Sequence, residues 1–307
     1  MKILTQARDL PHAPRRVCLA IGVFDGVHLG HQQVIRQAIH DASHLEAASV
    51  VVTFDRHPNH VVAPHAVPPA IHSLEEKLGA MDRLGVEATL VIPFDVELSR
   101  QPARDFIGAL AAGFGNIRAV CVGREFTFGH KRQGDVSLLE SMGAEMGFRT
   151  HGLAAVSLDG QVVSSTRIRE FIQNGDLDAA SQMLGRDYTL TGTVVRGDQL
   201  GTRIGFPTAN LAVNGLVTPP TGVYAVHAFH RGTPLRGVVN IGRRPTVSDH
   251  APDLRVEVHL LDYSGSLYGQ KLSLQFLRRL RDEQRFDSVE SLAQQIAKDV
   301  AAARDAF

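Results

Sequence analysis

Five continuous apolar runs in the first 185 residues constrain the fold of this chain more than any other feature. The runs are VCLAIGVF (17–24), SVVVTF (49–54), ATLVIPF (88–94), IRAVCVG (117–123) and LAAVSL (153–158). A strand that is apolar along its whole length is covered on both faces, as in parallel sheets. Helical patterns separate the runs, so this part of the chain predicts an α/β domain with a parallel sheet and right-handed crossovers.

The helical patterns have the expected period and start signals. One spans residues 31–42, and another opens with a capping box formed by Ser73 and Glu76. Their apolar faces consist of Val34, Ile35, Ala38 and Ile39 in the first, and of Leu74, Leu78, Met81 and Leu84 in the second. Residues 166–175 and 176–184 predict two further helices that close the domain.

The chain changes character after Arg186, where strand-like runs are separated by Gly- and Pro-rich turns. These runs are YTLTGTVVRG (188–197), GVYAVHAF (222–229), LRGVVNIG (235–242), LRVEVHLLD (254–262) and KLSLQFLRRL (271–280). Several alternate apolar and polar residues, which indicates an antiparallel sheet or a small barrel. A final helix is predicted over residues 288–307, with Asp287 or Ser288 as its N-cap. Its apolar face consists of Val289, Leu292, Ile296 and Val300.

Length and the change of pattern together predict two domains. The chain has 307 residues, and a domain typically takes roughly 100–200. We therefore expect an α/β domain over residues 1–186 and a second, β-rich domain over residues 187–307.

Composition excludes several classes of protein. With 32 basic and 32 acidic residues the formal net charge is zero, which argues against a nucleic-acid partner. No apolar stretch approaches the roughly 18 residues of a membrane span. Cys18 and Cys121 each lie inside an apolar run, so we expect buried thiols in a reducing compartment, the cytoplasm. The sequence leaves a homo-oligomer open.

The segment AIGVFDGVHLGHQQVI (20–35) passes from a predicted strand through a turn into a helix. Ligands bind at the carboxyl ends of parallel strands, and a helix start attracts anions. Gly26 and Gly30 permit a tight backbone, while His28 and His31 can donate hydrogen bonds to phosphate oxygens. The sequence contains no GxxxxGK[ST] motif, so a P-loop is excluded.

A second cluster, SSTRIRE (164–170), also follows an apolar run and opens a helix. The hydroxyls of Ser164, Ser165 and Thr166, with Arg167 or Arg169, could hold the more distant phosphates of a nucleotide. An ordinary N-cap with solvated arginines is the alternative for each residue taken alone.

The segment VVRGDQLGTRIGFPTANL (194–211) suits a loop that folds over phosphates, although a plain hairpin loop is the alternative. Gly197, Gly201 and Gly205 are four residues apart, with Arg196 and Arg203 between them, and Pro207 excludes a continuous helix. Further along, Thr208 and Asn210 present two hard oxygens on one side of an extended chain, which suits Mg²⁺.

GVFDGVHLGH and SSTRIRE resemble the HxGH nucleotidyltransferase superfamily. The segments VVTFDRHP (51–58) and VGREFTFGHKRQG (122–134) narrow the resemblance to bacterial bifunctional riboflavin kinase/FAD synthetases. The later segments GFPTAN (205–210), GVYAV (222–226), VVNIGRRPTV (238–247) and VEVHLLDYSGSLYG (256–269) resemble the riboflavin kinase barrel. Three positions differ from the family's usual residues: Arg56 replaces Pro, Glu125 replaces Asp or Asn, and Val247 replaces Phe.

The resemblance implies a Rossmann-like HxGH nucleotidyltransferase domain followed by a small antiparallel barrel with a C-terminal helix. It further implies that the barrel converts riboflavin and ATP into FMN, and that the first domain converts FMN and ATP into FAD and pyrophosphate. His28 and His31 would lie at the α-phosphate, Glu257 would be the base of the kinase, and Thr208 and Asn210 would hold Mg²⁺ with ATP. The implied nucleotide-binding residues are Gly22, Phe24, Asp25, Gly30, Ser164, Ser165, Thr166, Arg167, Arg169, Gly201, Arg203, Gly205 and Pro207. The implied flavin-binding residues are His57, Glu125, Phe126 and Phe128.

The sequence leaves two other functions open. One is a different small-molecule nucleotidyltransferase fused to a barrel of other purpose, and GFPTAN with Glu257 weighs against it. The other is a non-catalytic flavin-binding regulator that keeps the fold, and the retained His28, His31 and Glu257 weigh against that.

Overall fold

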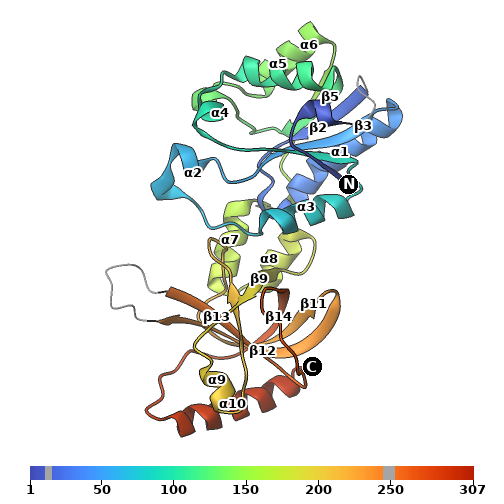
Figure 1. Cartoon of the computed structure of the whole chain (residues 1–307). Helices are drawn as coiled ribbons and strands as arrows, with labels where there is room; N and C mark the ends of the chain where they lie inside the picture. Colours follow the sequence, from blue (N-terminus) through green and yellow to red (C-terminus); the bar gives the residue numbers. More distant parts are fainter. Residues whose placement is uncertain (11–15, 245–252) are drawn as a thin grey trace. The chain divides into compact units, whose positions relative to one another are not determined.

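The computed structural model describes residues 1–10, 16–244 and 253–307. The chain divides into two compact units, labelled by element in Figure 1. The first unit comprises residues 1–167 and 183–185, and the second comprises residues 168–182 and 186–307. The two units interleave along the chain, since the segment 168–182 groups with the second unit and residues 183–185 with the first. A single domain boundary after residue 186 therefore stays a prediction.

The first unit contains the predicted parallel sheet, in the order β1-β4-β3-β2-β5-β6. Its strands are β1 (Lys2–Leu4), β2 (Arg16–Ile21), β3 (Ala48–Phe54), β4 (Ala88–Ile92), β5 (Asn116–Gly123) and β6 (Arg149–Leu153). The four central strands coincide with four of the five apolar runs. The order reverses at β2, from which β3 and β4 follow on one side and β5 and β6 on the other. A ligand crevice is expected at such a point.

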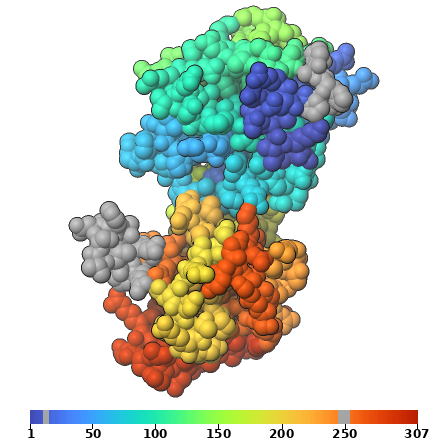
Figure 2. Space-filling model, in the orientation of Figure 1, coloured from blue at the N-terminus to red at the C-terminus, as the bar shows by residue number. Residues whose placement is uncertain are grey.

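The sequence prediction fails at the edges of this sheet. The strand predicted over residues 153–158 is wrong, because the sixth strand is the more polar segment 149–153. An edge strand is covered less completely, so an apolar run does not mark it. For the same reason no apolar run marks the three-residue β1. Its Ile3 is 59% exposed, and this N-terminal segment (dark blue) lies at the surface in Figure 2. Residues 157–162 instead form a small hairpin, β7 (Ser157–Leu158) and β8 (Gln161–Val162).

Helices cover both faces of the sheet. Buried residues of α1 (Leu29–His44) and α3 (Leu74–Arg83) form a core with Ala20 and Val51 of the sheet. Residues of α5 (Ala103–Phe114) and α6 (Val136–Met146) form the core on the other face. The remaining helices of the unit are short: η1 (Ala7–Asp9), η2 (Asp25–Val27), α2 (Asn59–Val62), η3 (Pro64–Ala66), α4 (Val96–Arg100) and η4 (His130–Arg132). The predicted capping box is confirmed, since Ser73 and Glu76 each bond the other's backbone N–H.

The second unit is a closed barrel with strand order β10-β13-β12-β11-β14-β9 and antiparallel pairing throughout. Its strands are β9 (Thr189–Val195), β10 (Ala209–Ala212), β11 (Gly222–His230), β12 (Thr233–Arg244), β13 (Asp253–Leu260) and β14 (Lys271–Arg281). Helices α9 (Leu200–Arg203) and α10 (Val289–Arg304) belong to this unit. Helix α7 (Ser165–Asn174) begins in the first unit, and α8 (Leu177–Leu184) ends in it. The strand pattern alone left sheet and barrel open, whereas the family resemblance implied a barrel with a C-terminal helix, and that prediction is confirmed.

Helix α10 packs on the outside of the barrel. Ser288 is its N-cap, and Ala303 is fully buried against Val223 and Ala225. The predicted apolar face is wrong at Val289, which is 48% exposed. The spacing of apolar residues shows which side of a helix is apolar, but not how much of that side packs against the rest of the protein.

A buried ion pair connects this helix with the barrel. Nε and Nη2 of Arg281 on β14 donate to Oδ1 and Oδ2 of Asp299, both at 2.8 Å. The two side chains are only 16% and 6% exposed, so each charge depends on the other.

Arg281→Met leaves the carboxylate of Asp299 buried without its cation. We expect the free energy of unfolding of the second unit to fall by about 3 kcal/mol, measured by urea denaturation of the full chain. Arg304→Met is the matched control, because it removes a pair of the same bidentate form, with Asp262, from exposed positions. Equal losses in the two variants would contradict a role for burial.

Candidate active sites

The turn that leaves β2 has an unusual backbone. Phe24, Gly26 and Val27 have φ angles of 53°, 80° and 43°, in the left-handed region that glycine alone adopts without strain. Phe24 and Val27 are nevertheless only 2% and 1% exposed. Such strain persists only where the surroundings hold it, and it is frequent at functional sites. We call residues 22–31 the phosphate turn.

Hydrogen bonds from distant segments hold the phosphate turn. The carboxylate of Asp25 accepts from the backbone N–H of Ile71 at 3.1 Å. The backbone carbonyl oxygen of Asp25 accepts from the hydroxyl of Ser165 at 3.0 Å. The side-chain amide of Gln32 donates to the carbonyl oxygens of Val27 and Leu184 at 3.0 and 2.8 Å. Asp25 and Ser165 thus bring together the two sequence clusters predicted to bind the nucleotide.

His28 and His31 lie at the start of α1 with their rings stacked, 3.6 Å between centroids and 18° between planes. His28 is the N-cap, and its Nδ1 accepts from the backbone N–H of His31 at 3.3 Å, which leaves Nε2 as a donor. Gly30 makes room for this ring, since a Cβ there would lie 3.2 Å from it. At a helix start, such donors can stabilise charge on a phosphoryl group.

The surroundings of the His31 ring keep it neutral. Burial lowers the pKa of His31 well below its ordinary value, and the charges of His28 and Lys77 lower it further. The imidazole is therefore neutral at pH 7. Among the described residues, its buried Nδ1 has no hydrogen-bond partner.

The side chains of the SSTRIRE cluster make different contacts from one another. Ser164 caps α7 by accepting from the backbone N–H of Arg167 at 3.3 Å, and the guanidinium of Arg167 donates to the side chain of Gln161. Thr166 is exposed. Arg169 belongs to the second unit, so its predicted phosphate contact stays a prediction.

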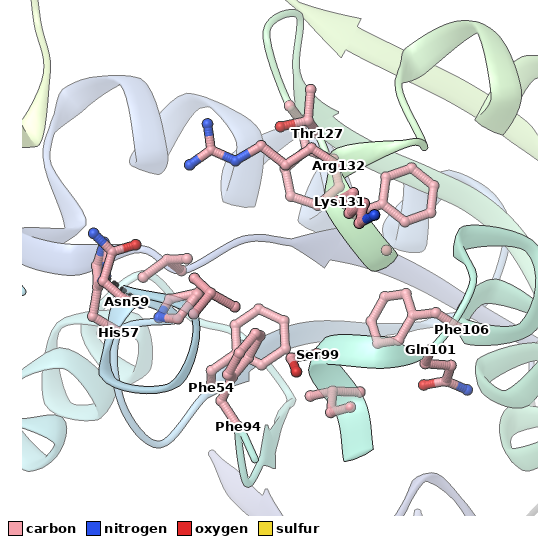
Figure 3. Close-up of a pocket in the computed structure, with 17 residues that line it drawn as sticks. Phe54, His57, Asn59, Phe94, Ser99, Gln101, Phe106, Thr127, Lys131 and Arg132 are labelled. Carbon is pink, nitrogen blue, oxygen red and sulfur yellow. Dashed lines mark hydrogen bonds between the residues drawn. The ribbon is translucent and has the colours of Figure 1, made fainter. Parts of the chain in front are cut away.

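An aromatic cavity of about 570 Å³ opens in the first unit. Figure 3 shows aromatic side chains around it, and the aromatic cavity is lined by Phe54, Phe94, Phe106, Phe126 and Phe128 among others. Phe126 and Phe128 stack with 5.4 Å between centroids, and Phe54 and Phe94 meet edge to face at 5.3 Å. Val23 of the phosphate turn also lines it. These walls suit a flat aromatic ligand.

Three of the four predicted flavin residues line this cavity: His57, Phe126 and Phe128. Nδ1 of His57 accepts from the backbone N–H of Asn59 at 3.1 Å, so Nε2 is its donor. Glu125 is exposed and is not among the lining residues, and its contact with flavin stays a prediction. Arg56 instead binds Asp55 at 2.9 Å. Although burial acts to raise it, hydrogen bonds from Arg56 and a backbone N–H hold the pKa of Asp55 below its ordinary value.

Sequence reasoning missed the rest of the cavity wall and one buried cation. Phe54 and Phe94 end apolar runs, and such a run predicts only a strand position for them. Lys77 is buried on α3, three residues after Leu74 and four before Met81. A cation on an apolar stripe is the signal that could have identified it.

The second candidate site lies on the barrel, where strand register brings its polar residues together. Glu257 on β13 pairs with Asn210 on β10 and with Asn240 on β12. Glu257 alternates with the buried Val256 and Val258, so these three polar side chains share the outer face of the barrel. The structure thus unites Glu257 with one of the two predicted magnesium ligands.

The glycine-rich loop packs closely on this face. A Cβ at Gly197 would overlap the side chain of Asn210, and one at Gly201 would overlap the carbonyl oxygen of Phe206 and lie 3.2 Å from Oγ1 of Thr208. Gly205 has a φ of 88°, while Arg203 and Pro207 are exposed. The carbonyl oxygen of Pro207 lies 2.8 Å from Nδ1 of His259 on β13.

An arginine connects the same loop with the base position. Nη1 of Arg255 lies 2.8 Å from a carboxylate oxygen of Asp198 in the loop and 3.9 Å from Oε1 of Glu257. Both carboxylates therefore share one cation.

A stacked histidine pair at a helix start beside an aromatic cavity, together with a carboxylate beside a glycine loop on a barrel, defines a two-site nucleotide-using transferase. An FAD synthetase family model matches residues 10–167, and a riboflavin kinase family model matches residues 184–307. The chain belongs to the bifunctional riboflavin kinase/FMN adenylyltransferase family.

Curated proteins of that name are similar along the whole chain. The Escherichia coli K12 protein is 37% identical over 100% of this chain and 98% of its own length. The Haemophilus influenzae protein is 37% identical over 94% of both chains, and the Bacillus subtilis protein is 35% identical over 92% and 89%. The family prediction and its two activities are confirmed at this level, and neither alternative is supported.

A crystal structure described as a macrolide-efflux protein from Streptococcus pneumoniae has a TM-score of 0.82 and 27% identity, over 98% of each chain. Among the described residues, no helix combines the length and apolar character that crossing a bilayer requires. Cys18 and Cys121 are free and buried, as predicted. Residues 245–247 of the VVNIGRRPTV segment, with Val247, lie outside the described part of the chain.

Gly197→Ala places a methyl group where the Asn210 side chain lies. We expect the riboflavin kinase rate to fall at least about tenfold, because displacing a predicted Mg²⁺ ligand costs alignment of the reacting groups, while supplied FMN is still converted to FAD. Gly108→Ala is the control, since its Cβ would meet nothing within 4 Å. Chromatography of flavins measures both steps, and a parent-like kinase rate in Gly197→Ala would contradict the close approach.

Proposed function

We propose that the barrel transfers the γ-phosphoryl group of ATP to the 5′-hydroxyl of riboflavin, and that the first unit then transfers AMP from a second ATP to FMN. The single observation that supports adenylyl transfer best is the stacked His28–His31 pair, on a turn whose Val23 lines the aromatic cavity. A flavin ring in that cavity has its phosphate end available to a nucleotide on the same turn.

At the first site, an oxygen of the FMN phosphate attacks the α-phosphorus of ATP, and the bond to pyrophosphate breaks. The attacking phosphate is already ionised, so no base is needed, and the task is to position it and to stabilise negative charge. Nε2 of His28 and the N–H groups at the start of α1 are the donors for this charge. Ser164, Ser165 and Arg167 are the groups for the departing pyrophosphate.

At the second site, the attacking group is an alcohol, which must lose its proton as the new bond to phosphorus forms. Glu257 is the base for this proton. Its side chain is 30% exposed, so substrate can reach it.

Thr208 and Asn210 are the proposed Mg²⁺ ligands. Their hydroxyl and amide oxygens are hard donors, which fit this ion together with ATP oxygens. The bound ion would neutralise charge on the phosphates. Gly197 and Gly201, which pack against these two side chains, keep them in place.

We also propose that the enzyme acts in the cytoplasm. Burial raises the pKa of Cys18 to about 11 and raises that of Cys121 as well. Thiols of this kind are inert and are kept in a reducing compartment, which is also where ATP is available.

His28→Ala and His31→Ala each remove a ring of the stacked pair. We expect FAD formation to fall by about a hundredfold or more, as for loss of a charge-stabilising donor, while FMN accumulates from riboflavin and ATP with Mg²⁺. Chromatography of the products measures both. Absence of FMN and FAD from the parent reaction would sink the proposed function, and equal loss of both products in the variants would show that the sites are not independent.

Glu257→Gln keeps the shape of the base but removes its ability to take a proton. We expect FMN production from riboflavin to fall about 10²- to 10⁴-fold, while supplied FMN is still adenylylated at the parent rate. A riboflavin kinase rate equal to the parent's would show that Glu257 is not the base.

A further inference from the structure

Lys77 is a buried cation that the proposed mechanism does not use. It lies on α3 and is 8% exposed, beside Ala80 and Met81 of the core between helices and sheet. Lysine is almost never buried unless it is paired, because removing an ammonium ion from water is costly. Its position therefore depends on specific partners.

The ammonium group has three N–H bonds, and the protein uses all of them. Nζ donates to the carbonyl oxygen of Phe54 at 2.8 Å, to the hydroxyl of Thr53 at 3.1 Å, and to the carbonyl oxygen of Val23 at 3.2 Å. The hydroxyl of Thr53 donates in turn to the carbonyl oxygen of Val23 at 3.1 Å. These contacts form a closed cluster and fix Nζ in place.

The acceptors belong to both parts of the adenylyltransferase site. Val23 lies in the phosphate turn, and Phe54 ends β3; both line the aromatic cavity. Their carbonyl oxygens point at one place, so they would repel each other without a cation between them. Lys77 therefore connects the turn that carries His28 and His31 with the wall of the cavity.

Burial and two nearby carboxylates act in opposite directions on the pKa of Lys77. Burial has the largest effect and lowers the pKa of Lys77 to about 8, while Asp25 and Asp55 act to raise it. Lys77 is thus protonated at neutral pH.

We propose that Lys77 is a positioning residue for adenylyl transfer, which clamps Val23 to the end of β3 and so sets the place of the bound flavin relative to His28 and His31. This inference rests on the proposed function of the first unit. Because its three N–H bonds are used within the protein, Lys77 acts through the turn and the cavity wall and does not touch substrate.

The test compares Lys77→Met and Lys77→Arg with Arg83→Met, a matched control at an exposed position of the same helix. For each full-length variant, kcat for FMN adenylylation is measured at saturating FMN and ATP, and FMN affinity is measured by quenching of flavin fluorescence. We expect Lys77→Met to lower kcat about tenfold or more, because alignment is lost, while the FMN Kd changes little. Lys77→Arg should recover part of kcat, and Arg83→Met should match the parent.

Thr53→Val removes one member of the cluster with little change of shape, and we expect a smaller fall in kcat. If Lys77→Met does not fold, the kcat of Thr53→Val decides whether the cluster positions the site. A kcat equal to the parent's in both Thr53→Val and Lys77→Met overturns the assignment. It is also overturned if Lys77→Arg lowers kcat as much as Lys77→Met does. A fall in kcat accompanied by equal losses of FMN affinity and riboflavin kinase rate overturns it too, because that indicates collapse. A parent that makes no FAD refutes the proposed function itself, which is a distinct outcome.

Discussion

A strained turn between β2 and α1 is the feature on which the first site depends. Left-handed φ angles at the non-glycine residues Phe24 and Val27 cost about 1–3 kcal/mol each. Contacts of Asp25 with Ile71 and Ser165 offset this cost. The turn places His28 as the N-cap of α1, so the imidazoles and the helix start act at one point. The same turn contributes Val23 to the aromatic cavity, which links flavin binding to phosphate chemistry.

In the barrel, strand register brings the polar residues of the second site together. The barrel's interior is apolar, so its polar chemistry lies outside, where pairing of β10, β13 and β12 aligns Asn210, Glu257 and Asn240. A slip by one residue would turn the apolar side chains of a strand outward, so burial of the apolar interior holds this alignment. The glycine loop then packs on this face because Gly197 and Gly201 carry no side chain.

Local patterns predicted most of the fold because they express local physics. Four apolar runs became the central strands, and Ser73 became a cap as its spacing to Glu76 required. The prediction failed where local pattern carries little information: at the edge strands β1 and β6, and at Val289 of α10. An edge strand is half solvated, so its pairing depends on the neighbour that it meets rather than on its own composition.

The sequence by itself determined the two fold classes, the family, and the histidine, glycine and acidic positions that carry its motifs. Only the tertiary structure decided that Ser165 bonds the phosphate turn, that Asn210 and Glu257 are neighbours, and that Glu125 lies away from the cavity wall. It also placed Lys77, a helix residue by pattern, against the carbonyl oxygens of Val23 and Phe54. The physical reason is that these contacts join residues far apart along the chain, and a periodic pattern reports only which face of an element is buried, not what it meets there.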